Sequence, residues 1–188
     1  MMESIDTVLP GQGGFVGSTS IFTCEPHWYA AHTRANHEKS VAAQLARRSI
    51  EHYLPLYESM RVWKDRRKRL HLPLFPGYVF VHFELRNRLQ VLQIPGLVRL
   101  VGFGGIPKSL DEDEIQNLRS AIAKGARAEP FPYVRKGRRV RIIRGPFAGF
   151  DGIALRQRKN LRVVLKMDFI QRAILVDVDA SCLEIPPE

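Results

Sequence analysis

Cysteine is scarce in this chain of 188 residues, which contains only Cys24 and Cys182. Two thiols cannot build the disulfide network of a small secreted domain, and nothing in the sequence indicates an oxidising compartment. No apolar run approaches the roughly 20 residues that a membrane-spanning helix needs. The first 26 residues have no Lys or Arg and no continuous apolar core, so they do not predict a signal peptide. We therefore expect a cytoplasmic protein without a membrane partner.

Motifs for catalysis, metals and cofactors are also missing. The six histidines fall in no HExxH or comparable ligand pattern, and the sequence has no CxxC pair, P-loop or dinucleotide fingerprint. The acidic run at 111–114 can imitate a metal cluster, but such a run is also favoured at the positive N-terminal end of a helix. We therefore expect no enzyme, no metal and no cofactor.

Positive charge is what the chain has in excess. Lys and Arg number 29 against 19 Asp and Glu, which gives a formal net charge of +10 and an isoelectric point near 10.1. The charge is shared evenly, because residues 27–125 and residues 134–185 each carry +7. Such a balance predicts an anionic partner, most commonly nucleic acid.

Changes in composition divide the chain into four parts. Residues 1–26 are rich in glycine and offer little apolar surface, so they predict a flexible tail. A first domain is expected at 27–125. The segment 126–133 is predicted to be a linker, because its prolines remove backbone donors. A second domain follows at 134–185.

Alternating strand and helix patterns predict an α+β first domain, an antiparallel sheet flanked by helices. The predicted strands cover 28–33, 78–83 and 97–101, and the predicted helices cover 36–49, 86–94 and 110–124, the first of them capped by Asn36. The second domain has five short Val- and Ile-rich segments separated by turns. These predict a small five-stranded β-barrel.

The densest charge lies at 61–69, where six cations accompany one anion between two extended segments. This position predicts a hairpin tip whose cations can neutralise phosphates with little regard for sequence. Two interpretations stay open, since the cations can instead be merely solvated, and the tryptophan can stack on an unpaired base or pack on the sheet. The expected nucleic-acid-binding residues are Arg61, Trp63, Lys64, Arg66, Arg67, Lys68 and Arg69.

The strand that begins after Pro76-Gly77 is apolar on both faces. Tyr78 and Phe80 share one face, and Val79 and Val81 share the other. A sheet with one solvated face does not need this pattern. Either helices cover both faces, or the aromatic face receives a partner.

Several segments resemble the NusG family of transcription elongation factors. The N-terminal domain of that family is similar to Trp28-Tyr29 before a helix, Phe-Pro-Gly-Tyr-Val-Phe-Val at 75–81 and Pro-Gly-Leu-Val-Arg-Leu-Val-Gly-Phe-Gly-Gly at 95–105. Its C-terminal KOW domain, an SH3-like barrel, is similar to the stretch from Gly137 to Gly152. The resemblance covers residues 27–185.

The resemblance implies that the first domain binds the clamp helices of RNA polymerase and bridges the DNA channel. Bridging would suppress pausing and modulate termination or antitermination. The family uses an aromatic pocket for this contact, and the matching residues here are Phe75, Pro76, Tyr78 and Phe80. The basic hairpin would touch non-template or upstream DNA.

For the KOW domain, the resemblance implies recruitment of a small-subunit ribosomal protein, of the termination factor Rho, or of both. The matching loop positions are Phe147, Phe169 and Ile170. An exposed aromatic residue at a loop tip suits an interaction anchor, whereas the alternative is a residue folded back onto the barrel. Ribosomal proteins also carry KOW motifs, so a ribosome-associated RNA-binding protein is the alternative function. We expect a monomer.

Two segments depart from the housekeeping pattern of the family. The entry to the first helix at 32–38 and Leu-Pro-Leu at 72–74 look more like the specialised paralogues of the RfaH kind, which serve selected operons. Whether the factor is general or operon-specific, and whether Rho is recruited or excluded, stays open. Helical refolding of the second domain, as in RfaH, is disfavoured by its β-branched segments.

Overall fold

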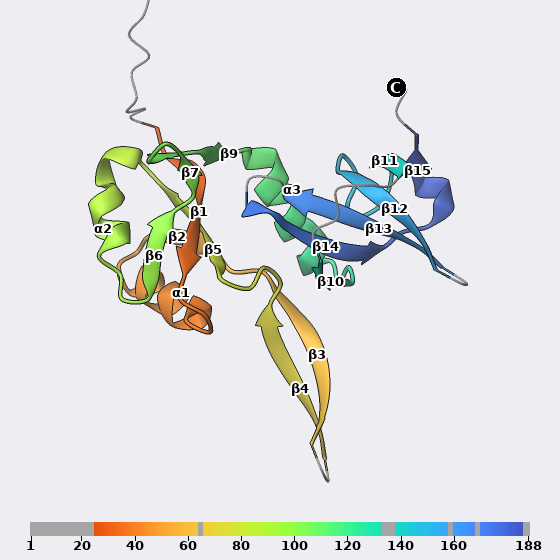
Figure 1. The fold of residues 1–188 in the computed structure, drawn as a ribbon, viewed down its shortest axis with the longest axis horizontal. Helices are drawn as coiled ribbons and strands as arrows, with labels where there is room; N and C mark the ends of the chain where they lie inside the picture. The colour runs from red at the N-terminus through yellow and green to blue at the C-terminus, as the bar shows by residue number, and fades with distance from the viewer. Residues whose placement is uncertain (1–24, 64–65, 133–137, 158–159, 168–169, 186–188) are drawn as a thin grey trace, which may run out of the picture.

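The computed structural model describes residues 25–63, 66–132, 138–157, 160–167 and 170–185, so the expected tail lies almost wholly outside the described residues. Two regions lie side by side (Figure 1). The first comprises β1 (His27–Thr33), α1 (Glu38–Arg47), β2 (Glu51–Tyr53), β3 (Leu56–Trp63), β4 (Arg66–Pro73), β5 (Tyr78–Phe83), η1 (Leu85–Asn87), α2 (Arg88–Leu92), β6 (Leu97–Leu100), β7 (Gly102–Phe103), β8 (Ile106–Pro107), β9 (Ser109–Leu110) and α3 (Glu112–Ala123). The second comprises β10 (Ala128–Phe131), β11 (Arg138–Ile142), β12 (Asp151–Gln157), β13 (Asn160–Met167), β14 (Arg172–Asp177), η3 (Ala180–Cys182) and β15 (Leu183–Glu184).

The N-terminal sheet is antiparallel and buried on both faces. Its strands follow the order β2-β5-β1-β6, and β9 also pairs with β1. Val79 and Val81 of β5 pack in one cluster with residues of α1 and α2. Tyr78 and Phe80 belong to a second cluster on the opposite face, together with residues of α3. The expected α+β architecture, a sheet flanked by helices, is confirmed.

Helix α1 begins differently from the prediction. Asn36 does not cap it, because Asn36 has a left-handed backbone (φ 62°) and His37 stands at the cap position without a side-chain hydrogen bond. Asn tolerates the left-handed region better than most residues, so it serves the turn before the helix. The first helical residue, Glu38, is buried and accepts a hydrogen bond from the Gly77 backbone N–H at 2.7 Å. Helix α1 therefore holds the turn that leads into β5.

Helix α3 starts as the acidic run predicts. The Asp111 side chain caps it by accepting a hydrogen bond from the Asp113 backbone N–H at 2.9 Å, and acidic residues fill its first turn. With 12 residues, α3 is the longest helix in the described part of the chain. Over the same residues, no helix has the length and apolar character needed to cross a bilayer.

Strands β3 and β4 form a two-stranded ribbon that projects from the body (Figure 1). Each strand has eight residues, and within the described residues the two strands pair only with each other. The base of the ribbon is closed by a hydrogen bond from the Leu74 N–H to the Pro55 carbonyl at 2.8 Å. Residues 61–63 and 66–69 of the predicted hairpin form the far half of this ribbon, and residues 64–65 lie outside the described residues.

The second region is one antiparallel sheet in the order β10-β14-β13-β12-β11-β15. Strands β11 to β15 are the five predicted ones. The structure adds β10, whose residues fall within the segment expected to be a linker. Pro130 is tolerated there because β10 is at the edge of the sheet, where a missing N–H breaks no ladder.

Candidate functional site: an aromatic face and a cationic ribbon

The turn at residues 75–78 sets the position at which β5 begins. Pro76 and Gly77 occupy its central positions, Gly77 has φ 86°, and the Tyr78 N–H donates to the Phe75 carbonyl at 3.1 Å. A proline followed by a left-handed glycine is the pattern of a type II turn. The turn, tied to Glu38 of α1, therefore fixes where Phe75 and Tyr78 leave the backbone.

An aromatic cluster covers the second face of the N-terminal sheet. The Phe80 ring meets Phe75 edge-on with 5.7 Å between centroids, and it stacks on Tyr53 at 6.5 Å. Phe75 and Phe80 are fully buried. Burial raises the pKa of Tyr53 to about 12, against the opposing charge of Arg119, whose guanidinium lies 5.8 Å from the ring centroid. Phe75, Tyr78 and Phe80 are thus brought together as the sequence predicts, while Pro76 stays exposed at the turn.

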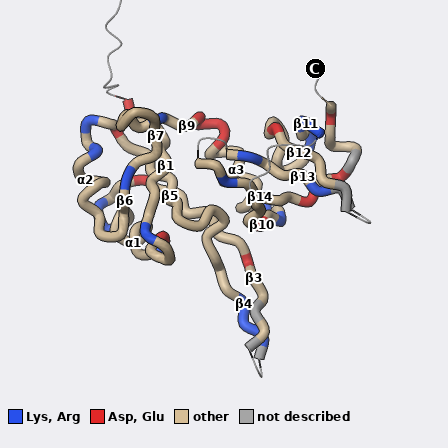
Figure 2. Tube along the Cα trace, in the orientation of Figure 1, with Lys and Arg blue, Asp and Glu red and all other residues tan. Residues whose placement is uncertain are grey.

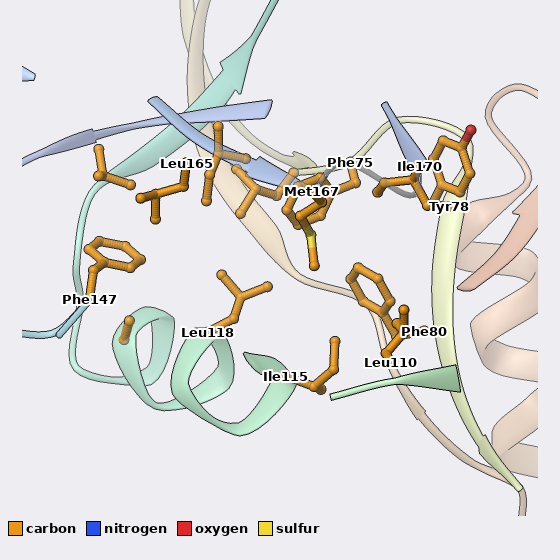
Figure 3. Close-up of a cluster of buried hydrophobic side chains, with 14 of the residues drawn as sticks. Phe75, Tyr78, Phe80, Leu110, Ile115, Leu118, Phe147, Leu165, Met167 and Ile170 are labelled. Atoms are coloured by element: carbon orange, nitrogen blue, oxygen red, sulfur yellow. The ribbon is translucent and has the colours of Figure 1, made fainter. Parts of the chain in front are cut away.

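The second region contributes side chains to this same cluster. Figure 3 shows Met167 at the end of β13 and Ile170 just before β14 lying against Phe75, Phe80 and Tyr78. Helix α3 completes the cover, because Ile115 and Leu118 face both the aromatic rings and the C-terminal sheet. One continuous apolar cluster therefore joins the two regions, and the aromatic face is buried inside the molecule.

Tyr78 stands at the edge of the contact and is 9% exposed. Arg172 of β14 holds its guanidinium 5.5 Å from the centroid of the Tyr78 ring, which is cation–π geometry. The centroids of the His32 and Tyr78 rings lie 5.3 Å apart. Burial, followed by the charges of Arg99 and Arg172, lowers the pKa of His32. The shift favours the neutral form of this histidine, which lies near a cation from the second region.

Of the three loop residues expected to recruit a KOW partner, the two that the structure describes are buried. Phe147 is 2% exposed and meets Phe150 edge-on at 6.2 Å, so it folds back in the way that the alternative interpretation described. Its ring joins the same cluster as Leu118 and Leu165. Ile170 is buried against the aromatic face, and Phe169 lies outside the described residues.

The cationic residues of the ribbon lie where the sequence places them. Arg67, Lys68 and Arg69 on β4 are exposed, and Figure 2 shows basic residues gathered along this strand. Trp63 and Arg66 face each other at the ends of the two strands, and Arg61 faces Lys68. The side chains of Arg61, Trp63 and Arg66, and the whole of Lys64, lie outside the described residues.

Sequence reasoning missed Met167 and Arg172, the two residues that meet the aromatic face beside Ile170. A signal was present in β13 and β14. Val163 and Leu165 share one face of β13 while Val164 lies on the other, and all three are buried. A strand with two apolar faces must be covered on both sides, and this holds for β13 as it does for β5.

These observations define an α+β region followed by a strand-rich region, joined by one apolar cluster. Residues 26–119, half of the chain, match the family model described as "Transcription termination factor nusG". The chain belongs to the NusG family.

Known members of the family agree with this assignment over most of the chain. NusG of Thermus thermophilus, named "Transcription termination/antitermination protein NusG", is 29% identical over 145 residues, 66% of this chain and 79% of its own length. The protein of the same name from Rickettsia felis is 24% identical over 191 residues and covers 94% of each chain. A solved structure described as "Domain interaction in Thermotoga maritima NusG" covers 87% of this chain and 98% of its own, with a TM-score of 0.55 and 23% identity. This last likeness supports the fold.

Proposed function

We propose that the protein is a transcription elongation factor that binds the clamp helices of RNA polymerase through Phe75, Pro76, Tyr78 and Phe80. The observation that carries this proposal is that the aromatic face already accepts apolar side chains, Met167 and Ile170, from outside its own domain. A surface that accommodates one apolar partner can accommodate another of similar character, and helical coiled coils offer such side chains. The names of the relatives support a role in transcription.

Clamp binding gives a mechanism without covalent chemistry. A protein that bridges the DNA channel binds the closed clamp better than the open one, and this difference in affinity favours the elongating state over the paused state. The protein needs no catalytic residue, metal or cofactor for this work. It acts as a cytoplasmic monomer.

In the structure, Met167 and Ile170 of the second region cover Tyr78 and Phe80. This closed form of the protein adds a condition to the mechanism. Polymerase can reach Tyr78 and Phe80 only after Met167 and Ile170 have left them, so opening must precede or accompany binding. Polymerase that binds the open form releases Ile170 for the partner of the KOW domain, a small-subunit ribosomal protein or Rho. By linkage, binding at either surface strengthens binding at the other by the same factor.

The ribbon gives the factor a second contact on the transcription complex. Its exposed cations Arg67, Lys68 and Arg69, with Arg61, Trp63, Lys64 and Arg66, touch non-template or upstream DNA while the protein sits on polymerase. Because the contact is electrostatic, its strength falls as salt rises. The RfaH-like entry segment at 32–38 favours a factor that serves selected operons.

Polymerase capture, compared with ribosome co-sedimentation, tests the proposal against a ribosome-associated KOW protein. The proposal expects capture of polymerase by the full chain, and it expects Tyr78→Asp to weaken this capture. Phe80 is unsuitable for the test because its complete burial makes any loss ambiguous. Co-sedimentation with ribosomes in the absence of polymerase binding would refute the proposal. Elongation assays with and without Rho then give the sign of the effect on pausing and termination.

A further inference from the structure

The far half of the β3–β4 ribbon is exposed on both of its faces. Met60 and Val62 on β3 are 55% and 73% exposed, and Arg67, Lys68 and Arg69 on β4 are exposed as well. Among the described residues, no ion pair involves these three cations. The ribbon therefore presents unneutralised positive charge away from the body of the protein (Figure 2).

The strand register places these cations on opposite faces. Val62 faces Arg67 and Met60 faces Arg69, so the four residues share one side of the ribbon. Lys68 is paired with Arg61 and takes the other side. A single strand laid along one face would leave at least one of these three charges unused. A partner with phosphates on both sides uses all of them.

We propose that the far half of the ribbon enters the major groove of duplex DNA, with Arg67 and Arg69 toward one phosphate strand and Lys68 toward the other. This rests on the proposed function, in which the ribbon meets nucleic acid, and it names the form of that nucleic acid. A sheet with side chains on both faces is about 10 Å thick. The major groove of B-form DNA is about 12 Å wide and admits it, whereas the minor groove is about 6 Å wide. The major groove of duplex RNA is too narrow for side chains to read.

The exposed valine fits the same placement. A strand of eight residues spans roughly 26 Å, long enough for its far end to enter a groove while its base stays on the protein. Val62 lies near that end, beside exposed cations, and exposes 73% of its surface. On the face that it shares with Arg67 and Arg69, Val62 meets thymine methyl groups along the base edges, which offer an apolar contact.

The first experiment measures binding of the full chain to short nucleic acids, without polymerase, by fluorescence anisotropy. Duplex DNA should bind more tightly than the same single strand or duplex RNA. A duplex whose major groove is filled by glucosylated hydroxymethylcytosine should bind roughly tenfold more weakly, while netropsin in the minor groove should have no effect. Equal binding to the filled and open duplexes, or tighter binding to the single strand or duplex RNA, overturns the proposal.

The second experiment uses variants of the exposed residues, which leave the core untouched. Arg67→Gln with Arg69→Gln should reduce the slope of log affinity against log salt by about 1.8, and Lys68→Gln should reduce it by about 0.9. Val62→Thr keeps the shape but replaces a methyl group with a hydroxyl, so affinity should fall a few-fold at an unchanged slope. The matched control, Lys39→Gln with Arg47→Gln on α1, should bind like the wild type. An equal loss in the control, or unchanged binding in all ribbon variants, contradicts the proposal. Because polymerase is absent, neither result depends on clamp binding.

Discussion

Tyr78 is the residue at which the two proposed roles of the first domain meet. It belongs to the aromatic face that we propose binds polymerase, and the Arg172 guanidinium of the second region lies 5.5 Å from the centroid of its ring. Its neighbour Phe80 is fully buried, with Phe75 and Tyr53 around it. The two aromatic residues of β5 therefore differ in what a substitution reports. Changes at Phe80 report on stability, whereas changes at Tyr78, at the edge of the cluster, report on stability and on the contact with Arg172 together.

Phe80→Ala should lower the free energy of unfolding by about 3–5 kcal/mol, because it removes a fully buried ring and leaves a cavity in the shared cluster. Urea unfolding measures this loss. Phe103→Ala is the control, since Phe103 is 71% exposed on the β7–β8 hairpin and should change stability little. A loss below about 1 kcal/mol at Phe80 would show that the cluster is not packed as described.

His32 should make stability fall in acid. Its pKa is lowered in the folded protein, so the unfolded chain takes up the proton more readily. Stability is therefore full above the unfolded pKa of about 6.5 and decreases as the pH drops below it, until the folded pKa is passed. His32→Gln should flatten this part of the profile. Urea unfolding at a series of pH values measures the difference, and parallel profiles for both proteins would contradict the assignment.

At the scale of single elements, α1 shows how a helix can be predicted while its ends are not. The helix ends in a Schellman motif, with the Ser49 N–H bonded to the Ala46 carbonyl and the Ile50 N–H bonded to the Leu45 carbonyl, each at 3.0 Å. Ser49 occupies the left-handed position with φ 56°, where glycine is usual. Its serine therefore costs the protein some stability.

Ser49→Gly should stabilise the protein by about 1 kcal/mol, because glycine adopts the left-handed backbone without the steric cost that a Cβ imposes. Ser40→Gly, inside the same helix, should destabilise by roughly 0.5 kcal/mol, because glycine is a weaker helix former than serine. The urea midpoints of the two variants should move in opposite directions. A lower midpoint for Ser49→Gly would contradict the left-handed assignment.

Most elements could be predicted from local pattern, since the apolar alternation of β5, β13 and β14 and the acidic start of α3 are visible in the sequence. The ends of α1 could not, because Asn36 fits both a cap and a left-handed turn, and tertiary contacts decide between them. Strand β10 could not be predicted either, because it contains Pro130. Proline is excluded from the interior of a sheet, but an edge strand tolerates it.

At the scale of the molecule, the sequence predicts only in part which elements cover the aromatic face. The two apolar faces of β5 require two covers, and the sequence left helices and a partner as alternatives. The structure uses both, α3 and the second domain. Which of the many apolar segments would supply Met167 and Ile170 depends on packing between distant parts of the chain, and no local pattern encodes that choice.

Ile170→Asp should open the molecule, because a carboxylate cannot be buried against Phe75 and Tyr78 without a partner. Small-angle X-ray scattering should show a larger radius of gyration than for the wild type. Ile143→Asp makes the same chemical change in the same domain, at a residue that is 43% exposed, and should leave the radius unchanged. A wild-type radius for both variants would mean that other contacts hold the domains together.

The central claim is that the face carrying Tyr78 and Phe80 binds polymerase once the second domain has left it. The most direct measurement is the affinity of purified RNA polymerase for the full-length wild type, Ile170→Asp and Ile143→Asp. The account predicts that Ile170→Asp binds more tightly, by about the factor by which its open fraction exceeds that of the wild type, and that Ile143→Asp binds like the wild type. Unchanged or weaker binding of an opened Ile170→Asp variant would contradict the account.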